Sequence, residues 1–194
     1  LGALSNAMIT GGTNLILYEN AVISHDLYDP HRDDTAEELH RRTFVHPSRG
    51  EISWLMPTTL PVRLPRAAAF TDACSANYAH WLTEVLPKIH LFCREDRYAG
   101  TPIIVDAGLH PNLAESLQLV AGDSRRIITL VPEETVLVEE LLAVSVAGYV
   151  PFGRRRRTGW GHSHGLFSGQ GLAVLCDHLY GALAVGESSG RMKL

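Results

Sequence analysis

The sequence predicts an α/β fold in which a Rossmann-like parallel sheet, flanked by helices, follows a small β-rich lead-in. Short continuous apolar runs, rich in β-branched residues, recur between residues 102 and 146, and buried parallel strands have this character. A helical pattern separates them at the spacing of β–α–β units, which form parallel sheets covered by helices on both faces. The two patterns together predict one regular α/β domain.

Composition divides the chain into four parts. Residues 1–7 end in Ser-Asn-Ala ahead of Met8, resemble a tag-cleavage remnant, and are left out of the fold prediction. Residues 8–60 form the β-rich lead-in with a charged loop, and residues 61–185 form the Rossmann-like domain. Residues 186–194 are predicted to be a linker, because they are rich in Gly and Ser.

The lead-in is predicted to be irregular. Residues 9–24 favour a β-hairpin whose turn is Glu19-Asn20. Residues 26–51 are polar and predict a loop with a short charged helix, and three prolines in residues 52–70 predict extended segments and turns.

The domain that follows is more regular. Strands are predicted at residues 67–70, 102–106 and 126–130, with further extended segments at 135–138 and 141–146. Helices are predicted from Asn77 to Arg94, at residues 112–120 with Pro111 at the first turn, and at residues 168–183 with Ser168 as the cap.

Composition also limits the class of protein. The chain has 194 residues, 45% of them hydrophobic and 20% charged, which is enough apolar material for a core. A net charge of −4 gives no electrostatic case for nucleic acid. Three widely spaced cysteines argue against a disulfide framework and fit a reducing, cytoplasmic location. No apolar run approaches the ~20 residues of a spanning helix, so no membrane span is expected, and peripheral association stays open.

Four polar residues share one stripe of the helix predicted from Asn77. The first is Asn77, and His80, Glu84 and Lys88 follow it after three, four and four residues. Apolar side chains fill the rest of the helix. One interpretation is a solvated face with an ordinary His–Glu pair. Two details favour a site for a polar substrate. Asn77 stands where an N-cap is expected, and Pro87 removes a helical hydrogen bond and bends the helix.

The run Asn-Tyr-x-His-Trp-Leu-x-Glu-x-Leu-Pro-Lys at residues 77–88 resembles the signature of glycosyltransferase family 61, which includes bacterial proteins of capsular polysaccharide biosynthesis. Members of that family show Asn, an aromatic residue, His, a second aromatic residue and Leu, then an acidic residue and Leu-Pro before a basic residue. The segment at residues 102–109 resembles the strand and turn that follow. The resemblance covers roughly residues 60–185.

The resemblance implies the first half of a GT-B-like glycosyltransferase. The reaction would be transfer of a sugar from a nucleotide-sugar donor to a hydroxyl of a glycan or polysaccharide, with no cofactor beyond the donor. It also implies a second half downstream that holds much of the donor site. The chain ends at Leu194 without such a half, so we expect a truncated enzyme that is inactive by itself.

The resemblance also suggests roles for the stripe. His80 would be the base that takes the acceptor proton, because imidazole titrates near working pH. Glu84 would orient His80, raise its basicity or act as the base itself. Asn77 and Lys88 would hold sugar hydroxyls or a phosphate.

Other residues are weaker candidates for substrate binding. Asp106 and His110 follow a predicted strand at the edge where α/β sheets place ligands, and a simple turn is the alternative. Arg154 and Arg155 begin a run of four arginines that suits phosphate oxygens, with a solvated loop as the alternative. His162 and His164 lack a third ligand at a recognisable spacing, so no metal site is predicted.

Three alternatives stay open beside sugar transfer: a non-catalytic module that binds a glycan or a protein partner, a metal-dependent hydrolase using His162, His164 and Asp106, and a structural domain without a site. Self-association is also expected if an apolar face is exposed. The sequence places that face at residues 149–152 with Trp160, Leu166 and Phe167.

Overall fold

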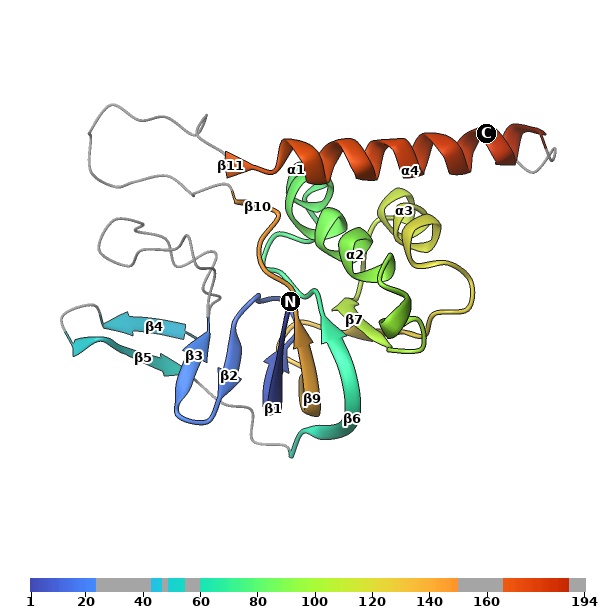
Figure 1. Cartoon of the computed structure of the whole chain (residues 1–194). Coiled ribbons are helices and arrows are strands. Elements are labelled where there is room, and N and C mark those ends of the chain that lie inside the picture. Colours follow the sequence, from blue (N-terminus) through green and yellow to red (C-terminus); the bar gives the residue numbers. More distant parts are fainter. Residues whose placement is uncertain (24–42, 47–48, 55–59, 150–165, 189–194) are drawn as a thin grey trace, which may run out of the picture.

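A seven-stranded mixed sheet forms the centre of the molecule (Figure 1). The structure, a computed structural model, describes residues 1–23, 43–46, 49–54, 60–149 and 166–188. The strand order is β3-β2-β1-β9-β6-β7-β8. These strands are β1 (Gly2–Thr10), β2 (Ile16–Tyr18), β3 (Ala21–Ile23), β6 (Val62–Ala69), β7 (Ile103–Asp106), β8 (Ile127–Leu130) and β9 (Thr135–Ala143).

Four neighbouring strands, β9, β6, β7 and β8, are parallel and confirm the α/β prediction. In chain order β6 is the first of them, and β7 and β8 extend the sheet on one side. The chain then crosses back, so that β9 pairs with the other edge of β6. This order, 3-2-1-4, is the one with which a Rossmann sheet begins, and the strand order reverses between β6 and β9.

The N-terminal strands extend the same sheet. β1 pairs antiparallel with β9 over its full length, from Gly2 opposite Ala143 to Thr10 opposite Thr135. Residues 1–7, which the sequence prediction left out of the fold, therefore form most of β1, and Ala7 is fully buried. The predicted hairpin is confirmed as β2 and β3, joined at Glu19 with φ of 53°.

The strands differ from the prediction in three further places. β6 begins at Val62 rather than at residue 67 and includes Pro65. This proline is tolerated because β7 pairs only with the last residues of β6 and leaves the Pro65 edge open on that side. The two segments predicted at residues 135–146 are one strand, β9. Part of the polar stretch at 26–51 belongs to a separate hairpin of β4 (Thr43–His46) and β5 (Glu51–Trp54), and the helix predicted there falls outside the described residues.

The described helices gather together above the sheet (Figure 1). They are α1 (Tyr78–His80), the π-helical η2 (Trp81–Val85), α2 (Leu86–Cys93), the 3-10 turn η3 (Asp96–Tyr98), α3 (Pro111–Ala121) and α4 (Gly169–Ser188). Pro111 and the Ser168 cap stand where the sequence predicts them, and the Ser168 hydroxyl oxygen accepts from the N–H of Gly171 at 3.1 Å. Short β10 (Gly148–Tyr149) and β11 (Leu166–Phe167) pair beside this layer. No described helix is long and apolar enough to cross a bilayer.

Two apolar clusters form the core. The first joins the sheet to the helices through residues such as Trp81, Phe92 and Leu117. The second contains strand residues, among them Ile9, Ile104 and Val138. No residue of a described helix belongs to the second cluster. Within the described part of the chain, the helices therefore cover one face of the sheet, whereas the sequence predicts helices on both faces.

A buried histidine lies where α2 meets α4. His90 is 1% exposed, and neither ring nitrogen has a hydrogen-bond partner among the described residues. Its ring centroid lies 4.9 Å from that of His178. Burial lowers the pKa of His90 from 6.5 to about 4, with smaller effects from His178 and Arg94. His90 is therefore uncharged near neutral pH.

We expect the α2–α4 contact to weaken in acid. Because the folded-state pKa of His90 lies below its unfolded value, its contribution to stability is present above pH 6.5 and lost as pH falls towards 4. His90→Phe should reduce the acid-dependent fall in melting temperature, followed by circular dichroism between pH 7 and pH 4. His110→Asn, which removes an exposed imidazole and keeps a capping side chain, is the control. An unchanged acid dependence in His90→Phe would contradict the prediction.

Candidate functional site

The candidate site begins at the loop that follows β6. Asn77 has extended backbone angles, and its side-chain oxygen accepts hydrogen bonds from the N–H groups of Ala79 at 3.0 Å and His80 at 3.4 Å. The predicted N-cap is thus confirmed. The Asn77 amide oxygen serves the start of α1, which is a structural role.

Glu84 lies in a π-helical turn, η2. The N–H of Leu86 donates to the carbonyl of Trp81, five residues back, in place of the usual four-residue bond. Pro87, at the start of α2, has no N–H to offer the Thr83 carbonyl. The bend that the sequence predicts at Pro87 therefore takes the form of a π turn, a feature often found at functional sites.

His80 and Glu84 form a buried pair. The His80 Nδ1 atom lies 2.5 Å from Glu84 Oε1, and the side chains are 11% and 5% exposed. Among the described residues Oε1 makes no hydrogen bond of standard geometry, and its close contact is with Nδ1 of His80. The contact fits the role that the resemblance suggests for Glu84, which is to orient His80. It does not fit an open, solvated helix face.

The Thr83 carbonyl, which receives no hydrogen bond from Pro87, lies in a tight contact with β10. β10 crosses η2 so closely that a Cβ on Gly148 would overlap the carbonyl oxygen of Thr83 and lie 2.8 Å from Cδ1 of Phe167. Only glycine lets β10 approach here. This contact could not be predicted from the sequence, because Gly148 and Thr83 are far apart along the chain.

Gly148→Ala should lower the free energy of unfolding by about 1–3 kcal/mol, because the added methyl group forces β10 away from η2. Urea denaturation would measure the loss. Gly100→Ala is the matched control, since a Cβ there meets nothing within 4 Å. Equal stability of the two variants would show that the close approach is not required.

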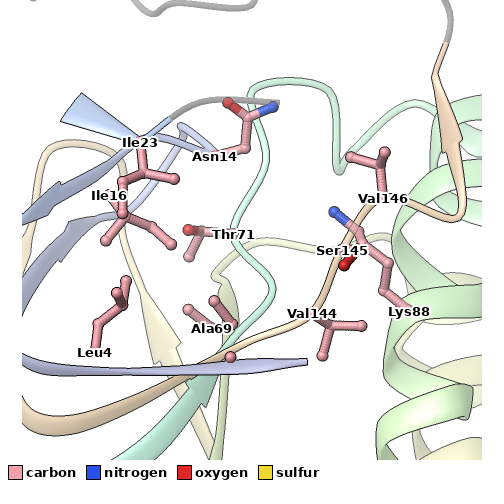
Figure 2. A pocket seen from close by; sticks show the side chains of 12 residues that line it. Leu4, Asn14, Ile16, Ile23, Ala69, Thr71, Lys88, Val144, Ser145 and Val146 are labelled. Carbon is pink, nitrogen blue, oxygen red and sulfur yellow. The ribbon is translucent and has the colours of Figure 1, made fainter. Parts of the chain in front are cut away.

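A pocket of about 310 Å³ lies at the carboxyl ends of β6 and β9 (Figure 2). Ala69 and Thr71 border it from the end of β6, and residues 143–146 border it from the end of β9. Open α/β sheets bind ligands at this position, where the strand order changes direction. Of the sequence-predicted site residues, Lys88 lines this pocket, whereas His80 and Glu84 do not.

Lys88 reaches into the pocket from α2, and its ammonium lies towards Ser145 and Val146 in Figure 2. The residue is 6% exposed. None of the ion pairs or hydrogen bonds among the described residues involves its ammonium. Most of the Lys88 side chain is thus buried, its ammonium faces the pocket, and the described residues provide it with no anion.

Asp106, at the end of β7, ties two loops together. Its Oδ1 accepts from the N–H of Gly12 at 2.6 Å, and its Oδ2 accepts from the N–H of Asp72 at 2.7 Å. Burial raises the pKa of Asp106 to about 6, although hydrogen bonds from Asp72, Gly12 and Ser75 act in the opposite direction. Both carboxylate oxygens thus hold backbone groups. The structure gives Asp106 a scaffold role next to the pocket.

The remaining predicted residues do not join this site. His110 is exposed and caps α3 through Nδ1, which accepts from the N–H of Asn112 at 3.3 Å. Arg154, Arg155, His162, His164 and most of the predicted apolar face lie outside the described residues, and of that face Leu166 and Phe167 are exposed. Within the described segments, no cluster of His, Cys, Asp or Glu could hold a metal ion.

The sequence did not reveal three polar residues of the pocket, Asn14, Thr71 and Ser145. Thr71 and Ser145 follow the parallel strands β6 and β9, whose carboxyl ends meet at one edge of the sheet, and that rule could have indicated them. Asn14 follows β1, which runs antiparallel to β9, so no such rule indicates it.

No family model, curated protein or solved structure matches this chain.

Proposed function

We propose that this protein is a glycosyltransferase that moves a sugar from a nucleotide-sugar donor to a hydroxyl of a glycan or polysaccharide acceptor. Its sheet would be one Rossmann-like half of a GT-B-like enzyme. The observation that carries the proposal is the buried His80–Glu84 pair, at the end of α1 and in the π turn that follows it, within the segment that resembles the glycosyltransferase family 61 signature. The 3-2-1-4 order of the parallel strands adds support, because nucleotide ligands bind sheets of this order.

Sugar transfer needs a base next to the acceptor hydroxyl. Glu84 at Nδ1 favours the imidazole tautomer that carries its proton there, and the lone pair of His80 is then on Nε2. As the acceptor oxygen attacks the anomeric carbon, Nε2 takes the hydroxyl proton. The bond from the anomeric carbon to the donor phosphate breaks, and its electron pair leaves with the phosphate oxygen.

Glu84 then acts as the positioning group. A carboxylate beside an imidazole stabilises the imidazolium that forms when the proton arrives, and the buried setting strengthens this interaction. His80 ends α1 and Glu84 lies in the π turn directly after it, so helical backbone rather than a flexible loop positions both side chains. Arg154 and Arg155 remain the predicted cations for the leaving diphosphate.

The test has two parts. A thermal-shift screen of nucleotide sugars on this chain measures donor binding. An assay of product mass, on enzyme that contains both proposed halves, measures transfer to oligosaccharide acceptors. We expect a stabilising donor in the first and transfer in the second. Binding of a glycan or nucleotide sugar without any transfer would favour the non-catalytic binding module. The absence of both donor binding in the first part and transfer in the second would overturn the proposal.

A further inference from the structure

The pocket at the β6–β9 junction has a different chemistry from the His80–Glu84 pair. Most of the described side chains that line it are aliphatic: Leu4, Ile16, Ile23, Ala69, Val144 and Val146. Figure 2 shows that they approach from β1 to β3, from β6 and from the segment after β9, and surround a shared space. A ligand held here would meet mainly hydrocarbon groups of the pocket wall.

The polar groups of the pocket are few. Lys88 supplies the single charge among the described lining residues, and Asn14, Thr71 and Ser145 supply an amide and two hydroxyls. The Lys88 ammonium stands at the wall of a mainly apolar pocket with no anion among the described residues, and an anion in the pocket would compensate its charge. Because one cation balances one negative charge, the pocket suits a monoanion better than a phosphate dianion.

The volume limits the size of the ligand. At about 310 Å³, the pocket is at the lower end of the range for small-molecule sites, which begins at roughly 300 Å³. A whole nucleotide sugar does not fit into this space. A sugar alone is also a poor match, since its many hydroxyls would meet aliphatic walls that offer no hydrogen bonds.

We propose that this pocket is a second ligand site, separate from the proposed site of sugar transfer, which binds a small carboxylate with an apolar body. The carboxylate pairs with the Lys88 ammonium and accepts from the hydroxyls of Thr71 and Ser145. The apolar body, of roughly five to eight carbons, fills the aliphatic part of the pocket. The sequence prediction that Lys88 holds a sugar hydroxyl or a phosphate is replaced by this assignment.

The test uses hexanoate as the probe, measured by isothermal titration calorimetry on the whole chain. Hexan-1-ol keeps the apolar body without the charge, whereas acetate and inorganic phosphate keep charge without the body. We expect hexanoate to bind at least tenfold more tightly than any of the three. Lys88→Met keeps the length of the side chain and should weaken hexanoate at least tenfold. Equal binding by Lys88→Met, or stronger binding of phosphate than of hexanoate, would overturn the proposal.

A second measurement needs no variant. Lys88 and Lys193 are the two lysines of the chain, so reductive methylation followed by peptide mass spectrometry reports on both at once. Hexanoate should slow methylation of Lys88 severalfold and leave the rate at Lys193 unchanged. Hexan-1-ol should protect Lys88 less. An unchanged Lys88 rate at a saturating hexanoate concentration would place the carboxylate elsewhere and reject the site.

Discussion

Replacing His80 by alanine is expected to slow sugar transfer by about 10²–10⁴, the usual effect of losing a general base. The buried contact with Glu84 makes this variant harder to interpret than an exposed one. Removing the imidazole leaves a buried carboxylate without its partner, and breaking a buried pair in this way costs about 3–5 kcal/mol of stability. Lost activity could then reflect lost folding.

A double variant, His80→Ala with Glu84→Ala, separates the two effects. It removes both members of the buried pair and leaves neither side chain without its partner, so most of the stability should return, because replacing a whole buried pair is often nearly neutral. Transfer should stay as low as in His80→Ala. Both quantities are measurable, by urea denaturation and by initial rates of product formation. Activity that recovers together with stability would mean that the pair supports the fold and takes no part in transfer.

The stability advantage of wild type over Asp106→Asn should shrink by about 3 kcal/mol as pH rises from 4 to 7. The folded-state pKa of Asp106 is about 6, against an ordinary value of 3.8, and each unit is worth about 1.4 kcal/mol. Because the folded-state pKa is raised, the contribution of Asp106 is fully present below pH 3.8. It is lost as pH rises through 6.

Denaturation of both proteins at a series of pH values would measure this difference. The loss of stability that His90 causes in acid is the same in wild type and variant, so it cancels when their free energies of unfolding are compared. The Asp106→Asn variant taken alone should therefore lose stability more steeply in acid than wild type does. A stability difference that is constant with pH, or that grows as pH rises, would contradict the raised pKa.

The sequence predicts local features of this fold well. The β-branched run at residues 103–106 and Pro111 at the start of α3 mark their elements through short-range chemistry. The His80–Glu84 contact is also local, because an interval of four residues brings two side chains together on any helix. These features depend on neighbours within about one helical turn.

Long-range contacts account for what sequence reasoning missed. The segment at residues 2–7 has no pattern of its own that marks it as part of the sheet, and it becomes a strand because β9 offers a partner edge. Glu139 and Glu140 are both exposed within β9, which hides the alternation expected of one strand. The pocket combines chain ends from β1, β6 and β9, and no window of the sequence contains them together.

The pairing of β1 with β9 has a consequence for the order of folding. Thr10 and Thr135, whose hydroxyls lie 3.0 Å apart, are separated by 125 residues, so β1 leaves the ribosome long before its partner exists. At 5–20 residues per second, the delay is roughly 6–25 s. The unit from β6 to β8 contains nearer contacts and can form during that time, since loop closure favours short separations. β1 then docks late, against a strand that also completes the pocket.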